Sequence, residues 1–201
     1  ETAVVFGLLA KPNVRHIHIG LPCGTGSRAR EIPIKAEDLA RGVPEVRPLL
    51  PDEEPMGRSD LKPREAARVA SANALARLTS KVIVWAHSRG ISWCLENPEN
   101  SRMWNIPDIA KLGKLPGAMA TCYDACAHGG QRKKAQKLLH CLGELDKLSA
   151  RCQGGHVHLP WVPLFERKRF IGFASNLEPE YPEFFCTRYV ECLSAAYGLS
   201  L

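Results

Sequence analysis

The chain has 201 residues, of which 45% are hydrophobic, and it carries a formal net charge of +6. This composition can build a packed core, which excludes wholesale disorder, and no apolar run approaches the ~18 residues that a membrane span needs. Eight cysteines are too sparse for a disulfide scaffold. We therefore expect free thiols in a reducing, intracellular compartment, nuclear or cytoplasmic, and the charge weakly favours a polyanionic partner.

The first predicted elements are a helix over residues 1–11 and a strand over residues 15–21. The sequence of the second segment, RHIHIGL, alternates polar and apolar side chains as a short strand does. The chain begins without Met, a basic n-region or a small-residue cleavage site. We interpret it as the middle of a longer polypeptide rather than as a secreted precursor.

Residues 31–62 are rich in Pro, Glu, Asp and Arg and show little periodicity, which predicts a long insertion or mobile loop. From Pro63 the pattern becomes helical, because apolar side chains recur at three- and four-residue steps as far as Trp85. Gly90 is the expected C-cap of this helix.

The remaining chain predicts three more strands and three helices. The strands are ISWCLENP at 91–98, GAMATCYDA at 117–125 and AQKLLHCL at 135–142, the last two joined by a turn. Short helices are expected over 101–112 and 143–152, then an irregular stretch over 152–182, and an amphipathic helix from Pro182 onward.

This order of elements predicts an α/β fold with helical crossovers. We expect a partial Rossmann-like sheet within residues 1–150, followed by an irregular Cys/His-containing segment and a terminal helix over 151–201. Ligands of such sheets gather at the carboxyl ends of the strands. Cys23 and Glu96 both follow such ends, which makes them the first candidates for a site.

Cys23 directly follows Pro22 at the exit of the first strand, in a turn that is also basic. A thiolate is a strong, soft nucleophile, and the nearby Arg28 and Arg30 would lower the pKa of this thiol. The alternative interpretation is a buried or incidental thiol.

Three ordered segments resemble the DNA (cytosine-5) methyltransferase family. They are Pro22, Cys23 and Ser27 after the first strand; Glu96, Asn97 and Pro98 after the second; and Gly129, Arg132 and Lys134 between the last two. In that family a Pro-Cys turn carries the nucleophile, an E-N-V triplet follows the next strand, and a Q-x-R-x-R segment lies between two strands. QRKK at 131–134 is a loose version of that segment.

The resemblance implies that Cys23 adds to C6 of a cytosine flipped out of DNA. Glu96 would bond the ring N3 and the exocyclic amine, and Arg132 would hold the base oxygen or a phosphate. It implies the following substrate-binding residues: Pro22, Ser27, Arg28, Arg30, Asn97 and Lys134.

The resemblance also implies S-adenosylmethionine as the cofactor of the full-length protein. The family's glycine-rich cofactor loop precedes the Pro-Cys strand by two or three strands, whereas only 22 residues precede Cys23. We therefore expect this chain to hold the other half of the sheet and to be inactive alone. Two alternatives are a degenerate, mobile-element-derived nucleic-acid-binding domain and a hydrolase that uses Cys23 with His87 or His128.

A second candidate site is the segment RCQGGHVHLPW at 151–161. Cys152, His156 and His158 have the spacing C-x-x-x-H-x-H, which lets one loop wrap a tetrahedral zinc ion. We assign Cys186 as the fourth ligand, with Cys141 and Cys126 as alternatives. The competing interpretation is a plain loop with chance histidines.

Overall fold

The computed structural model describes residues 2–177 and 180–200, and a four-stranded sheet forms its centre. The strands lie in the order β1 (His16–Gly20), β2 (Ser92–Pro98), β4 (Ala135–His140) and β3 (Met119–Asp124). β1 and β2 are parallel, and β4 is antiparallel to both β2 and β3. The mixed α/β class and all four of these strands are as the sequence predicted.

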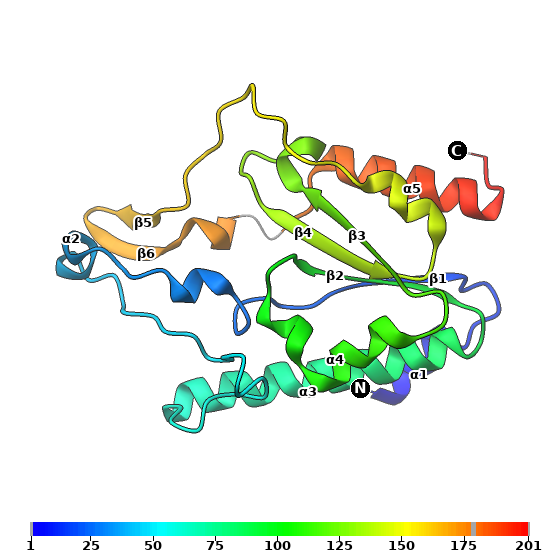
Figure 1. Cartoon of the computed structure of the whole chain (residues 1–201), viewed down its shortest axis with the longest axis horizontal. Coiled ribbons are helices and arrows are strands. Elements are labelled where there is room, and N and C mark those ends of the chain that lie inside the picture. Colours follow the sequence, from blue (N-terminus) through cyan, green and yellow to red (C-terminus); the bar gives the residue numbers. More distant parts are fainter. Residues whose placement is uncertain (1, 178–179, 201) are drawn as a thin grey trace.

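One face of the sheet is covered by helix α3 (Pro63–His87), which connects β1 to β2 (Figure 1). It packs there with α1 (Thr2–Leu9) and α4 (Pro107–Ala110). Ile83 of α3, Trp93 and Leu95 of β2 and Ile109 of α4 are fully buried in this layer. α3 ends at His87, and Gly90 takes a left-handed conformation (φ 69°) just beyond it.

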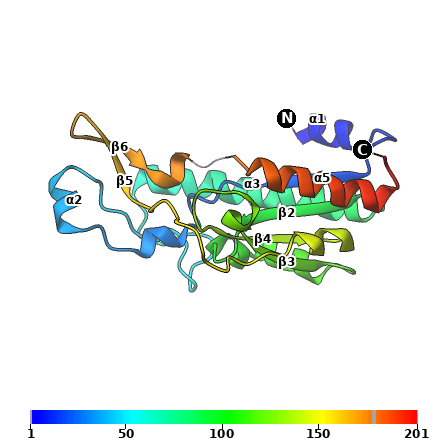
Figure 2. The ribbon, with the colours of Figure 1, turned by 90° about the horizontal axis from the view of Figure 1, so that it is seen from above.

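The opposite face is covered by α5 (Glu183–Tyr197), which runs along the sheet in both views (Figure 1, Figure 2). Phe185, Tyr189 and Cys192 of this helix pack against Cys94 and Leu138 of the sheet. The terminal helix that we expected in residues 151–201 therefore completes the core of the sheet instead of forming a separate unit.

The segment over residues 31–62 is mostly irregular, and part of it packs against the rest of the protein. It contains α2 (Ala36–Ala40), and Leu49 and Leu50 are fully buried in the core beside α3. Arg47 forms ion pairs with Asp60 at 2.8 Å and with Glu65 at 2.7 Å.

A hairpin of β5 (Pro163–Glu166) and β6 (Arg169–Phe173) lies within the stretch that we expected to be irregular. It lies with α2 at one end of the molecule (Figure 1, Figure 2), where the Arg41 guanidinium is 3.6 Å from the centre of the Phe165 ring. Among the described residues, no helix combines the length and the apolar character that a membrane crossing requires.

Candidate functional site

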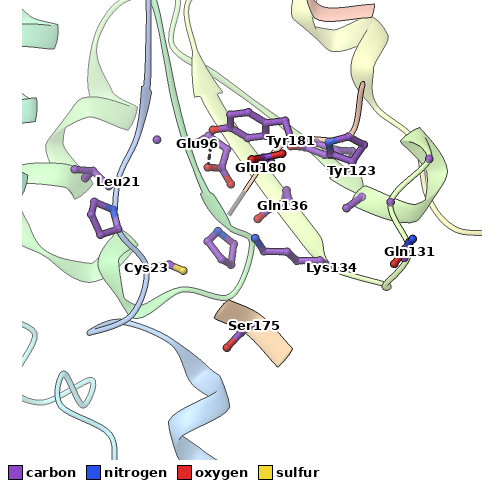
Figure 3. A pocket seen from close by; sticks show the side chains of 17 residues that line it. Leu21, Cys23, Glu96, Tyr123, Gln131, Lys134, Gln136, Ser175, Glu180 and Tyr181 are labelled. Carbon is purple, nitrogen blue, oxygen red and sulfur yellow. Dashed lines mark hydrogen bonds between the residues drawn. The ribbon is translucent and has the colours of Figure 1, made fainter. Parts of the chain in front are cut away.

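A cavity of about 1100 Å³ lies at the carboxyl ends of β1 and β2 (Figure 3). Four of the residues that the sequence assigned a catalytic or substrate-binding role line it, namely Pro22, Cys23, Glu96 and Lys134. The other lining residues are Gly20, Leu21, Pro98, Tyr123, Ala125, Gly129, Gly130, Gln131, Gln136, Ser175, Glu180, Tyr181 and Pro182. The expected meeting of Cys23 and Glu96 at neighbouring strand ends is therefore present.

The turn that carries Cys23 is held in place from both sides. The side-chain amide of Asn97, which is fully buried, donates a hydrogen bond to the Leu21 carbonyl at 2.7 Å. On the other side, Nε of Arg30 donates to the Gly24 carbonyl at 2.8 Å. Asn97 and Arg30 thus hold the backbone on either side of Cys23 and are not among the residues that line the cavity.

Glu96 is the buried acid of the cavity, with 7% of the residue exposed. The Tyr181 hydroxyl donates to its Oε2 at 3.0 Å, whereas Oε1 has no hydrogen-bond partner among the described residues. Burial raises the pKa of Glu96, while the bond from Tyr181 and the charge of Lys134 act in the opposite direction. The carboxyl group therefore keeps its proton to a higher pH than a surface glutamate and can donate it to a ring nitrogen.

A second buried oxygen without a partner lies in the same cavity. Oε1 of Gln136 makes no hydrogen bond within the described part of the chain, and the residue is 4% exposed. Buried polar atoms are nearly always hydrogen-bonded in folded proteins. Glu96 and Gln136 thus offer two oxygens that a polar ligand would satisfy.

Arg132 does not line this cavity, contrary to its expected role at the base. Its Nε donates to the Pro160 carbonyl at 3.2 Å and its guanidinium lies 5.4 Å from the centre of the Trp161 ring. The side chain is therefore used to hold the segment 160–161, and Lys134 is the cation that reaches the cavity (Figure 3).

Ser27 and Arg28 also lie outside the cavity lining. The Ser27 hydroxyl accepts a hydrogen bond from the Ala29 amide at 3.3 Å and so caps a short 3₁₀ turn. Arg28 forms an ion pair with Glu31 at 3.0 Å.

Tyr123, Gln136 and Tyr181 are among the lining residues that were not anticipated. Tyr123 and Gln136 face each other across β3 and β4, and only the register of that pair brings them to the cavity. Tyr181 precedes α5, and its approach to Glu96 depends on the long-range packing of that helix. A single sequence contains no local signal for either arrangement.

The predicted metal site is present as a group of four side chains, with one change of ligand. The ligand atoms of Cys126, Cys152, His156 and His158 all lie within 4.8 Å of one another. Cys152 Sγ is 3.8 Å from His156 Nε2 and 3.5 Å from His158 Nε2. Cys186 is exposed on α5 and is not part of the group, in which Cys126, one of the two alternatives, lies beside the three predicted ligands instead.

Cys126 takes the fourth position because it lies in the short turn that directly follows β3. Burial and the neighbouring Cys152 thiol raise the pKa of Cys126 to about 11. Bond lengths of about 2.3 Å to sulfur and 2.0 Å to nitrogen place the ligand atoms of a tetrahedral zinc roughly 3.3 to 3.8 Å apart. The two distances from Cys152 fit this range.

Comparison with protein-family models, with curated proteins and with solved structures finds no match to this chain.

Proposed function

We propose that the cavity activates a cytosine base for attack at C6, as in the DNA (cytosine-5) methyltransferase family that the sequence resembles. One observation carries the proposal: Cys23 and the buried Glu96, whose Oε1 has no partner among the described residues, line the same cavity at adjacent strand ends. A nucleophile and an acid in this relation are what addition to a pyrimidine ring requires.

The chemistry can be written for this chain's own side chains. The Cys23 thiolate forms a bond to C6, the C5–C6 π electrons shift into the ring, and Glu96 gives its proton to N3. C5 is then electron-rich and can take a proton from solvent. Loss of the original C5 hydrogen, return of the N3 proton to Glu96 and expulsion of the thiolate restore the base.

The methyl donor that the resemblance implies, S-adenosylmethionine, does not fit the described residues well enough to be assigned a site here. β1 is an edge strand of the sheet, with neither a further strand nor the implied glycine-rich turn on its outer side within the described residues. We propose that this is the edge at which the implied cofactor-binding half of a partial Rossmann-like sheet belongs. Residues 1–201 alone should then bind the cofactor weakly or not at all.

Exchange of hydrogen at C5 tests the proposal without the cofactor. DNA that carries tritium at C5 of cytosine, in single-stranded or mismatched form, should release tritium to water in the presence of the protein. Cys23→Ser should abolish the release, and Glu96→Gln should slow it by about 100-fold or more. Cys186→Ser, at an exposed thiol outside the cavity, is the matched control and should leave it unchanged.

The same experiment, with DNA binding measured beside it, distinguishes this function from the alternative of a degenerate nucleic-acid-binding domain. DNA binding that weakens steeply with salt, together with no tritium release, would identify a nucleic-acid-binding domain that has lost the chemistry. Absence of both binding and release would refute a nucleic-acid function at this cavity.

We further propose that Cys126, Cys152, His156 and His158 bind one zinc ion with a structural role. Two sulfur and two nitrogen ligands suit zinc, and the four side chains leave no position open for a substrate. The ion would fasten residues 152–158, which precede β5, to the turn that follows β3. Cys126 lies in this turn, and the other three ligands lie in residues 152–158. Glycines at 154 and 155 with left-handed conformations allow the loop to close around it.

Metal analysis of the purified protein tests this assignment. We expect about one zinc per chain, which Cys126→Ser should remove and Cys186→Ser should retain. Chelation should expose residues 151–162 to proteolysis. A zinc content that does not respond to Cys126→Ser would contradict the ligand set.

A further inference from the structure

A continuous row of hydrogen bonds leads away from Glu96 beneath α5. The Tyr181 hydroxyl, which donates to Glu96, is 3.0 Å from Nε2 of His18. The Tyr189 hydroxyl lies between two imidazoles, 3.0 Å from Nδ1 of His18 and 2.7 Å from Nε2 of His16. His16 and His18 are two residues apart on β1, so both project from the face that α5 covers.

The row continues to the far end of α5. Nδ1 of His16 is 2.5 Å from the Ser92 hydroxyl, which is 2.6 Å from the hydroxyl of Tyr197. Tyr197 is partly exposed, and its single hydroxyl proton can be donated either to the Arg15 carbonyl at 2.9 Å or to the Ser92 hydroxyl, so the row is continuous when this hydroxyl turns to Ser92. The row thus has one end in the cavity and the other at the surface.

The hydrogen bonds can all point in one direction. Because Tyr181 donates to Glu96, its oxygen accepts the Nε2 proton of His18, whose Nδ1 then accepts from Tyr189. Tyr189 in turn accepts the Nε2 proton of His16. Both imidazoles are then neutral, with the proton on Nε2. This agrees with their environment, since burial lowers the pKa of each to about 4.

We propose that this row is a proton relay between solvent at Tyr197 and the carboxyl group of Glu96. One solvent proton enters at Tyr197, each group passes its own proton to the next, and Oε2 of Glu96 gains the last one. Every tyrosine, serine and imidazole is left neutral, and both imidazoles end with the proton on Nδ1. Reversal of the same steps returns the proton to solvent.

The relay explains how a buried acid can exchange its proton while a ligand fills the cavity. Delivery of that proton to a base rests on the function proposed above, whereas the relay itself does not. His18 as a whole residue is exposed at the open edge of β1, but both of its ring nitrogens are bonded to tyrosine hydroxyls beside α5, and it is the loss of solvent around the ring that lowers its pKa.

Other titratable groups surround the row, and one of them, Cys94, is hydrogen-bonded through its thiol to the Tyr189 hydroxyl. Around Glu96 they are Lys134, Tyr123, Glu180, Cys23 and Cys94, and around the imidazoles they are His140, Cys94 and Cys192. Burial raises the pKa of Cys94 to about 12, so its thiol stays neutral throughout the range in which Glu96 titrates.

The ¹⁵N spectra of the imidazoles and the ¹³C signal of the Glu96 carboxyl group test the relay in the whole chain. Above the pKa of Glu96, both His16 and His18 should carry their proton on Nε2. As Glu96 becomes protonated, both should change together to Nδ1 before either gains a charge near pH 4. Tyr181→Phe should abolish this joint change while Glu96 still titrates. Tyr123→Phe, which removes a hydroxyl that belongs to no link of the row, should preserve it.

Imidazoles that keep one tautomer while Glu96 titrates would overturn the proposal, because a purely structural network has no reason to reverse. So would a joint change that survives Tyr181→Phe. The spectra need neither DNA nor cofactor. A joint change without tritium exchange would therefore retain the relay and reject the proposed function, and the opposite pair of results would reject the relay alone.

Discussion

At the scale of single residues, two neighbours on β2 serve the site from opposite faces of the sheet. Glu96 points into the cavity, and Asn97 points away from it and holds the turn that carries Cys23. Successive side chains of a strand alternate between faces, so one dipeptide can both place a carboxyl group in the cavity and hold the turn that carries Cys23. This explains physically why the adjacent residue types matter, whatever the reaction.

Asn97→Ala should destabilise the fold and loosen the Cys23 turn. The Leu21 carbonyl would lose its buried donor, which costs about 1–3 kcal/mol. Urea unfolding should show the loss, and mass mapping after alkylation should show faster modification of Cys23. Asn105→Ala, at an exposed amide that bonds Asp52, is the control and should change neither. Equal effects of the two variants would contradict the role of Asn97.

Gly20→Ala should disturb Glu96 through Tyr181. A Cβ at position 20 would lie 2.9 Å from the Tyr181 hydroxyl and 3.5 Å from Oε2 of Glu96, so the tyrosine ring must move. Loss of its hydrogen bond raises the pKa of Glu96 further, which the ¹³C titration of the carboxyl group would measure. Gly143→Ala, where a Cβ meets nothing within 4 Å, should leave that pKa unchanged.

At the scale of elements, periodicity and turn chemistry predicted the strands of the central sheet and the helices α3 and α5. The β5–β6 hairpin was missed because Arg167 and Lys168 take left-handed conformations, φ 46° and 66°, that usually require Gly, Asn or Asp. Strand ends pointed to Cys23 and Glu96, which line one cavity, whereas Cys126 and Tyr181 reach their positions only through contacts between distant segments. Such contacts leave no local trace in one sequence.

The packing of α3 gives a prediction for this layer. Ile83 is fully buried, and its neighbour Val84 is 42% exposed. Ile83→Ala should lower the free energy of unfolding by about 2–5 kcal/mol, because it leaves a cavity between α3 and the sheet. Val84→Ala should cost far less in the same urea titration, and similar losses would mean that α3 packs in another orientation.

At the scale of the whole molecule, buried imidazoles make stability depend on pH. Burial lowers the pKa of His16 and His18 to about 4 and also lowers those of His128 and His140. Between pH 4 and 6.5 the imidazoles of the unfolded chain therefore bind more protons than those of the native state, so the free energy of unfolding rises with pH. Glu96 acts in the opposite sense, since its raised pKa makes the native state bind more protons above pH 4.5.

The stabilising effect of the four imidazoles should exceed the opposite effect of the single carboxyl group. We therefore expect the urea concentration at the unfolding midpoint to rise from pH 4.5 to 6.5. Above pH 6.5 these five groups should change it little. His16→Gln should make the midpoint rise less steeply with pH, because the unfolded chain then has one imidazole fewer that binds a proton in this range. A midpoint that falls over this interval would show that the imidazoles are charged in the native state.

The length of α3 has a consequence for how this protein can change in evolution. Twenty-five helical residues span about 37 Å, whereas the five residues of β1 span only about 17 Å. The first turns of the helix therefore project past the sheet, and the chain before Pro63 packs against them (Figure 1). Asn73 holds the Met56 carbonyl at 2.7 Å, and Glu65 holds Arg47. Insertions or deletions in the chain before Pro63 would change the number of residues between Cys23 and Glu96 but neither the strand register nor the positions of these two residues in the cavity, so related chains should differ most in length there.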